Sequence, residues 1–232
     1  MERIRELFQN AQDSMVWSCL DGSMGKSVYL NDSAQITLGD FCFLAGKPNR
    51  EILKTIEVPI ITPDDEAWQQ LIEEEFPDAK RALRYATKKE YSPNIEKLRK
   101  LASALSEGYH IERIDESNIS LLCEDWSRDF ISLFENEEDY LKRGRGFIAI
   151  HRGKPVSGAS SYSVYRGGIE IEVDTKPEHR RKGLAAACSA RLILSCLADG
   201  LLPCWDAQNL MSLSLAEKLG YVFSHAYPVW VR

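Results

Sequence analysis

The sequence lacks the patterns that place a protein in a membrane, around a metal ion or in a disulfide framework. No apolar run approaches the roughly 20 residues needed to cross a bilayer. The six cysteines form no C-x-x-C pair and the four histidines show no ligand spacing, so we expect neither disulfides nor a metal site. The charged opening, Met1–Glu6, predicts no secretory signal. Together these absences favour a reducing, cytoplasmic setting without membrane contact.

Basic residues are also fewer than acidic ones. Lysine and arginine number 29 against 35 aspartates and glutamates, which gives a net charge of −6. A general nucleic-acid binder would carry a basic footprint, so we expect no nucleic-acid partner. The hydrophobic content of 44% and charged content of 28% are those of a soluble globular protein that can bury a sizeable core.

The first half of the chain carries no motif that we can connect with chemistry. Its periodicity predicts short strands at 27–30, 33–38 and 40–45, and helices at 3–15, 64–75, 78–89 and 94–107. We interpret the basic residues of the 78–89 and 94–107 helices as solvated faces. Alternating short strands and helices predict a smaller α/β domain over residues 1–108.

The second half, 109–232, is predicted to be an α/β (α+β) domain with a mixed sheet. Strands are expected at 109–114, 147–151, 156–165, 169–175 and 201–205. Helices are expected at 115–122, 126–134, 136–142, 184–198 and 209–219, with a closing hairpin at 221–225 and 228–231.

The stretch 169–185 is the most informative of this half. Residues 169–175 alternate apolar with acidic side chains, as in a half-buried strand. Lys176-Pro177 ends the strand, and Arg180-Arg181-Lys182-Gly183 then precedes a long run of helix formers. Because the first N–H groups of a helix are unpaired and carry partial positive charge, this turn predicts a phosphate-binding cradle.

Two motifs in this half resemble the GNAT superfamily of N-acetyltransferases. Arg180-Arg181-Lys182-Gly183-Leu184-Ala185 resembles that family's pyrophosphate signature, Q/R-x-x-G-x-G/A, between a strand and a helix. Asn209-x-x-Ser212 followed by Leu215-Ala216-Glu217-Lys218-Leu219-Gly220-Tyr221 is similar to its N-…-LYEKLGF segment. Shorter pieces resemble the zwittermicin A resistance branch: Gly39-Asp40-Phe41, Leu44-Ala45-Gly46, Gly144-Arg145-Gly146-Phe147 and Pro203-Cys204-Trp205-Asp206-Ala207.

The resemblance implies acetyl-CoA as co-substrate and assigns its contacts. The amides of Arg181, Lys182, Gly183, Leu184 and Ala185 would hold the diphosphate, and Arg180 and Lys182 would add charge. The strand end, Val173, Asp174 and Thr175, would bond the pantetheine arm and the thioester oxygen. Asn209 and Ser212 would meet the pantetheine or thiol, and Asn209 is equally well explained as a helix cap.

Glu170 and Glu172 are the candidates for the general base of such a reaction. Alternation places both on one face of the strand, opposite Ile169, Ile171 and Val173. If this face borders the substrate, one of them can take a proton from the amine, with Glu172 favoured because it lies closer to the strand end. If it faces solvent, both are ordinary strand carboxylates.

The position of the family's usual tyrosine, which protonates the departing thiolate, is Ala216 in this sequence. Ser212, Ser214 or a water could replace it, or the thiolate could leave unprotonated, and Tyr221 is expected in the core. The leading hypothesis is an N-acetyltransferase that acts on the primary amine of a small molecule by direct attack in a ternary complex. The net acidity suggests a cationic acceptor, such as an aminopolyol antibiotic, which would imply antibiotic resistance, or a polyamine.

Two other functions stay open at this point: a non-catalytic acyl-CoA-binding module, and a phosphate or nucleotide binder of another family. The domain over 1–108 either shapes the acceptor site or mediates formation of a homodimer.

Overall fold

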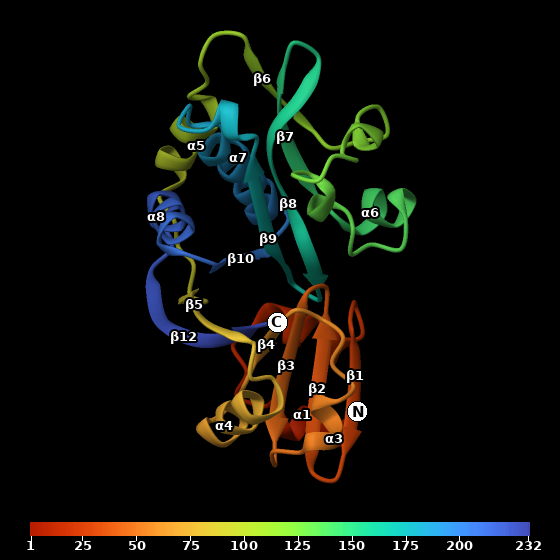
Figure 1. Ribbon diagram of the computed structural model, residues 1–232. Helices are drawn as coiled ribbons and strands as arrows, with labels where there is room; N and C mark the ends of the chain where they lie inside the picture. The colour runs from red at the N-terminus through yellow and green to blue at the C-terminus, as the bar shows by residue number, and fades with distance from the viewer.

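The structure, a computed structural model, describes all 232 residues and contains two β-sheets joined end to end (Figure 1). Helices and strands alternate along the chain and both sheets mix parallel with antiparallel pairs, which confirms the predicted α/β class.

The first sheet has seven strands in the order β1-β2-β3-β4-β12-β5-β11. All neighbours are antiparallel except β3 and β4. The strands are β1 (Lys26–Leu30), β2 (Ser33–Leu38), β3 (Phe41–Gly46), β4 (Ile60–Thr62), β5 (Lys80–Thr87), β11 (Asp206–Ala207) and β12 (Phe223–Val231).

The second sheet has the order β10-β9-β8-β7-β6, and only β9 and β10 are parallel. Its strands are β6 (Tyr109–Arg113), β7 (Gly146–His151), β8 (Lys154–Tyr165), β9 (Gly168–Thr175) and β10 (Leu202–Cys204).

Helices cover both faces of the second sheet. The α-helices are α1 (Glu2–Leu7), α2 (Ser14–Asp21), α3 (Arg50–Leu53), α4 (Glu66–Glu75), α5 (Ile95–Ser103), α6 (Glu137–Arg143), α7 (Leu184–Ala198) and α8 (Leu210–Leu219), and short 3₁₀ turns are η1 (Ile119–Leu121), η2 (Arg128–Phe130) and η3 (Pro177–His179). The apolar helix α7 packs against β7, β8 and β9. Helix α2, from the first half of the chain, contacts β8 and β9.

The side chains of β9 show that α2 and α7 lie on opposite faces. Ile169 and Ile171 belong to the main core with α7, whereas Glu170 bonds to Ser14 of α2. The alternation seen in the sequence is therefore confirmed, but the acidic face is covered by protein rather than turned to bulk solvent. No helix is both long and apolar enough to span a membrane.

Five predicted elements were wrong. The basic helix at 78–89 is strand β5, because Lys80–Thr87 pairs along its length with β12, and this long-range pairing overrides local helix propensity. The helix at 3–15 is interrupted between Leu7 and Ser14, where Asp13 caps α2. The helices at 115–122 and 126–134 are only the 3₁₀ turns η1 and η2.

The closing hairpin is the fifth correction, since 223–231 forms the single strand β12. Proline is accepted within it because β12 meets β4 only at its last two residues, Trp230 and Val231. The backbone of Pro228 therefore needs a partner on one side alone, where it lies opposite Leu83 of β5.

The division at 108/109 stays a prediction. Hydrogen bonding crosses it, because β11 and β12 from the second half complete the first sheet, with β12 beside β4 and β5 in Figure 1. Any functional unit of the first half therefore includes residues from the end of the chain.

Candidate active site

Strands β9 and β10 diverge and leave one edge of β9 without a neighbour. They pair only from Gly168 to Glu170, because β10 ends at Cys204 and the chain then enters β11 of the other sheet. The N–H of Lys176 donates to Val156 of β8, so alternation turns the N–H groups of Val173 and Thr175 toward the open edge. There the Thr175 N–H bonds only to the carboxylate of Asp174, at 2.6 Å. An extended ligand can lie along this edge.

The turn after β9 forms a nest of unpaired amides at the head of α7. Arg181 and Gly183 both have left-handed backbone conformations, with φ of 63° and 78°. The first helical bond of α7 runs from the Ala187 N–H to the Gly183 carbonyl, and the N–H groups of residues 181–186 have no partner. A Cβ at Gly183 would have only the Ala104 carbonyl oxygen nearby, at 3.9 Å, so the nest is open. This geometry suits a diphosphate.

The basic side chains of the nest are largely occupied by protein. Arg180 donates through Nε to the Thr175 carbonyl at 3.0 Å, and Lys182 donates to the Tyr109 hydroxyl at 2.8 Å. Arg181 is exposed and makes no such bond. The positive charge available to an incoming phosphate therefore comes mostly from the backbone N–H groups. Arg181 is the basic side chain of the nest that makes no hydrogen bond to protein.

Helix α8 begins beside this edge. Asn209 is its N-cap and accepts a bond from the Ser212 N–H at 2.9 Å, which confirms the cap interpretation. The Ser212 hydroxyl accepts a bond from the Trp205 indole at 3.1 Å. Ala216 is fully buried, and Tyr221 lies in the core with its hydroxyl bonded to the Pro203 carbonyl. Neither residue supplies a hydroxyl to the open edge.

Glu172 is the carboxylate of β9 that no other side chain holds. It is partly exposed, lies opposite Ser160 of β8 and accepts no side-chain hydrogen bond. Burial, together with the nearby negative charges of Asp129 and Asp174, raises the pKa of Glu172 to about 8. A carboxylate with this pKa is a stronger base than an ordinary glutamate, and it stands next to the open edge of β9.

Glu170 has a different environment although it shares the face. It is buried, with one carboxylate oxygen bonded to the Ser14 hydroxyl and the other accepting the Asp206 N–H at 2.7 Å. Burial raises its pKa to about 7, an effect partly offset by Lys89. Because both oxygens are occupied by protein donors, Glu172 is the one of the pair with an oxygen free for a substrate.

Residues of the first half form a wall beside Glu172. The Asp40 N–H donates to the Tyr162 hydroxyl at 3.3 Å, and Gly39 allows this approach because a Cβ there would collide with the same hydroxyl. Phe41 packs edge-on against Tyr162 and carries the Arg84 guanidinium 4.7 Å from its ring centroid. The sequence had placed Arg84 on a solvated helix.

Arg84 is instead tied to the end of the chain. Its Nε donates to the Asp206 carboxylate at 2.7 Å, with exposed side-chain fractions of 13% for Arg84 and 7% for Asp206. No motif marked Arg84. Asp206 stood within a quoted family segment, but only the crossing of β11 into the first sheet reveals its partner.

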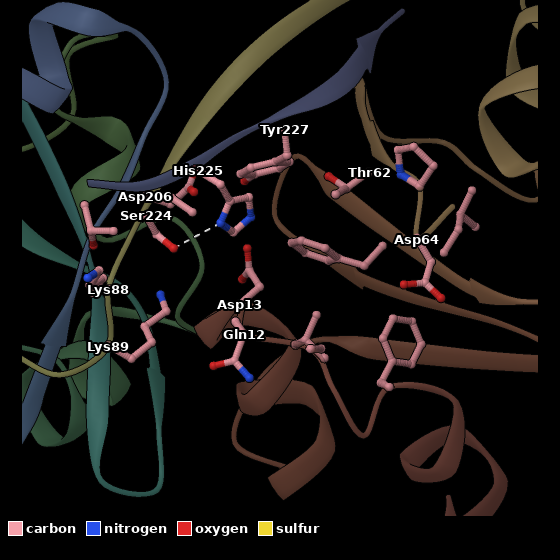
Figure 2. A pocket seen from close by; sticks show the side chains of 18 of the residues that line it. Gln12, Asp13, Thr62, Asp64, Lys88, Lys89, Asp206, Ser224, His225 and Tyr227 are labelled. Carbon is pink, nitrogen blue, oxygen red and sulfur yellow. Dashed lines mark hydrogen bonds between the residues drawn. The ribbon is translucent and has the colours of Figure 1, made fainter. Parts of the chain in front are cut away.

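A cavity of about 570 Å³ is lined by Asp206 and by Asp13, the N-cap of helix α2, which contacts β9 (Figure 2). Its lining comes from the α1–α2 link and the start of α2, the middle of β3, the ends of β4 and β5, the residue Asp206 and the start of β12. Sequence reasoning missed it because the contributing segments are far apart in the chain. No group of three or more His, Cys, Asp or Glu side chains is placed to hold a metal ion.

Comparison with known proteins identifies the family. The family model described as GNAT acetyltransferase matches residues 5–230, so the chain belongs to this family and is an N-acetyltransferase. A crystal structure of a GCN5-related N-acetyltransferase-like protein from Streptococcus suis is 42% identical, with a TM-score of 0.95 over 99% of this chain and 98% of that one.

More distant relatives agree. "Uncharacterized N-acetyltransferase YdfB" of Bacillus subtilis (strain 168) is 26% identical over 190 residues, which are 81% of this chain and 71% of that protein. A putative acetyltransferase of the GNAT family from Novosphingobium aromaticivorans is 16% identical, with a TM-score of 0.54 over 88% of this chain and 89% of that one, a likeness of fold. The zwittermicin A resistance branch stays a prediction.

Proposed function

We propose that this enzyme transfers the acetyl group of acetyl-CoA to the primary amine of a small cationic molecule, by direct attack in a ternary complex. The observation that carries the proposal is Glu172, a free carboxylate of raised pKa beside the unpaired edge of β9. Acetyl-CoA, which enzymes of this family use, supplies an acetyl group activated as a thioester.

Binding of the co-substrate is assigned to two sets of amides. Those of residues 181–185 hold the diphosphate, since they are unpaired and point out of the head of α7. Those of Val173 and Thr175 bond the pantetheine arm, and one of them stabilises the oxygen on which negative charge develops during attack. Asn209 and Ser212, at the start of α8, border the same arm.

Two proton movements complete the reaction. The carboxylate of Glu172 accepts the proton that the amine must lose, while the more enclosed Glu170 positions Ser14 and Asp206. Ala216 offers no acid for the departing sulfur. The Ser212 hydroxyl accepts from Trp205 and keeps its own proton free, so Ser212 or a water protonates the sulfur.

The acceptor class follows from the charge beside the site. Glu172, Glu170, Asp129 and Asp174 lie around the place of attack, and this favours an amine that arrives as an ammonium ion. Aminopolyol antibiotics and polyamines are such acceptors, and modification of the former would give antibiotic resistance. Free thiols at all six cysteines suit a cytoplasmic setting. The first half contributes Phe41 and Arg84 to the acceptor side, which is the role we assign to residues 1–108.

The proposal is tested in two stages. Calorimetric titration should show that acetyl-CoA binds more tightly than ADP, because ADP reaches only the diphosphate nest. Thiol release from acetyl-CoA should then require an added amine from a panel of cationic small molecules. Tight binding without amine-dependent thiol release across the panel would rule out the proposed reaction.

A further inference from the structure

One hydrogen bond links the cavity described above to strand β9, which carries the proposed base. Asp206 lines it, and the N–H of Asp206 donates to Glu170, which precedes Glu172 by two residues on the same face of β9. Two residues along a strand span roughly 7 Å, the length of a few methylene groups.

The cavity has an apolar wall and a charged end. Phe8, Val16, Phe43 and Leu44 form much of the wall, together with Pro63. The lining also contains four carboxylates (Asp13, Asp64, Glu90 and Asp206) but only two lysines (Lys88 and Lys89). Arg84 neutralises Asp206, so the carboxylates that remain to balance the two lysines are Asp13, Asp64 and Glu90.

Asp13 is the acidic group best placed to meet a ligand. One of its oxygens accepts the Met15 N–H at 2.8 Å, and its other oxygen has no protein donor. Figure 2 shows its carboxylate projecting into the cavity from below His225 and Tyr227. Burial and the charge of Asp206 raise the pKa of Asp13 to about 6, and Lys89 offsets this only in part. Such a carboxylate gains a favourable partner when a cation enters.

The other polar groups of the lining do not favour an anion. Lys89 is already surrounded by the negative charges of Glu170, Asp13 and Asp206. The imidazole of His225 shares a hydrogen bond with the Ser224 hydroxyl at 3.1 Å. The Thr62 hydroxyl is buried in the wall without a hydrogen-bond partner and is free to pair with a polar group of a ligand.

We infer that the acceptor is a diamine that extends from Glu172 past Glu170 into this cavity, and that the cavity binds the part of the acceptor that is not acetylated. Asp13 holds the second ammonium group, and a hydrocarbon spacer lies along Phe43 and Val16. The inference rests on the proposed function, because the first amine must reach Glu172. Asp13 is thus a specificity-determining residue that takes no part in proton transfer.

The test compares diamines with monoamines of equal length in the Asp13→Asn variant. Asparagine keeps the cap of α2, so only the charge changes. The matched control is Asp65→Asn, which makes the same change at the N-cap of α4 outside the cavity lining. The probes are diaminohexane, diaminooctane and diaminodecane, each beside hexylamine, octylamine or decylamine, with thiol release from acetyl-CoA as the readout.

We expect the wild-type enzyme to prefer at least one diamine over its monoamine by about tenfold in kcat/KM. Asp13→Asn should remove about tenfold from that diamine, mostly through KM, since a charge-assisted hydrogen bond is lost. The monoamines should change less than about twofold, and Asp65→Asn should leave both classes unchanged. Equal losses for diamine and monoamine, no preference for any diamine, or the same loss in Asp65→Asn would each overturn the inference.

Direct calorimetric binding of the preferred-length diamines separates this inference from the proposed reaction. If no amine is acetylated but a diamine binds and Asp13→Asn weakens it about tenfold, the cavity assignment holds and the reaction fails. If amines are acetylated and diamine binding is the same in wild type and Asp13→Asn, the reaction holds and the cavity assignment fails.

Discussion

Replacing Glu172 with glutamine should abolish most activity and at the same time stabilise the fold. Glutamine keeps the shape of the side chain but can neither take a proton nor ionise. A positioned general base contributes about 10²–10⁴-fold to rate, so we expect kcat to fall by about 100-fold or more. The opposite directions of the two effects distinguish a functional carboxylate from a merely structural one.

The stability gain follows from the pKa of Glu172, which the fold raises from 4.5 to about 8. Because the folded state then binds this proton more tightly than the unfolded state, the contribution of Glu172 to the free energy of unfolding falls as pH rises through that window. The full shift sets an upper limit of about 5 kcal/mol, and partial exposure brings our expectation to about 2 kcal/mol. Glu172→Gln should therefore match wild type near pH 4.5 and exceed it above pH 8.

The pH dependence of kcat/KM should show the same ionisation of Glu172. In wild type, kcat/KM should rise with pH as Glu172 ionises and level off above about 8. In Glu172→Gln it should keep rising toward the pKa of the free amine, because only neutral amine can then attack. Steady-state thiol release across pH and urea unfolding at pH 5 and pH 8 measure the two effects.

The matched control is Glu178→Gln, an exposed carboxylate in the turn η3, and acetyl-CoA affinity should be unchanged in both variants. Were Glu172→Gln to retain the wild-type rate and pH profile, or to be less stable than wild type at pH 8, the assignment of the base would be wrong.

Three further substitutions test the rest of the site. Gly183→Ala and Gly200→Ala each force alanine into a left-handed conformation at an open position at opposite ends of α7. Both should lose about 1 kcal/mol of stability, but only Gly183→Ala should weaken acetyl-CoA at least about tenfold by calorimetry. Asn209→Asp should keep the cap of α8 and its melting temperature, yet lower acetyl-CoA affinity if the side chain also meets the pantetheine; an unchanged affinity leaves capping as its whole role. Arg84→Ala should cost about 3 kcal/mol in urea unfolding, since it leaves the Asp206 carboxylate buried without its partner, and a loss below about 1 kcal/mol would contradict that account.

The parts of the site that consist of residues close together in the sequence were predictable from it. Strand β9, the nest before α7 and the cap at Asn209 each depend on residues within a few positions of one another. Their signals are local: alternation, a proline stop, a glycine at a helix start and an asparagine before an apolar run. The sequence could not show which of Glu170 and Glu172 keeps a carboxylate oxygen free. That depends on hydrogen bonds from Ser14 and Asp206, which lie far from β9 in the chain.

The errors have the same physical origin. Lys80–Thr87 consists largely of residues that accept a helix, and it becomes a strand only because β12 pairs with it from the end of the chain. Arg84 was therefore assigned to solvent, although it is paired with Asp206. A local signal was available at Asp13, since an aspartate before an apolar run is a common N-cap, and using it would have divided the first predicted helix correctly.

The chain's first half, which carries no recognisable motif, determines the chemistry of the motif-bearing half. A glutamate on a solvated strand would titrate near 4.5, and Glu172 departs from that value chiefly because protein covers its face. Part of that cover is Tyr162, held by the 39–41 turn through the Asp40 N–H. The raised pKa of the proposed base therefore depends on the contact between the two sheets. The residues proposed to select the acceptor lie at the same contact. Because β12 of the second half is built into the first sheet, we expect that cutting the chain at residue 108 would disrupt both the surroundings of the proposed base and the wall beside it.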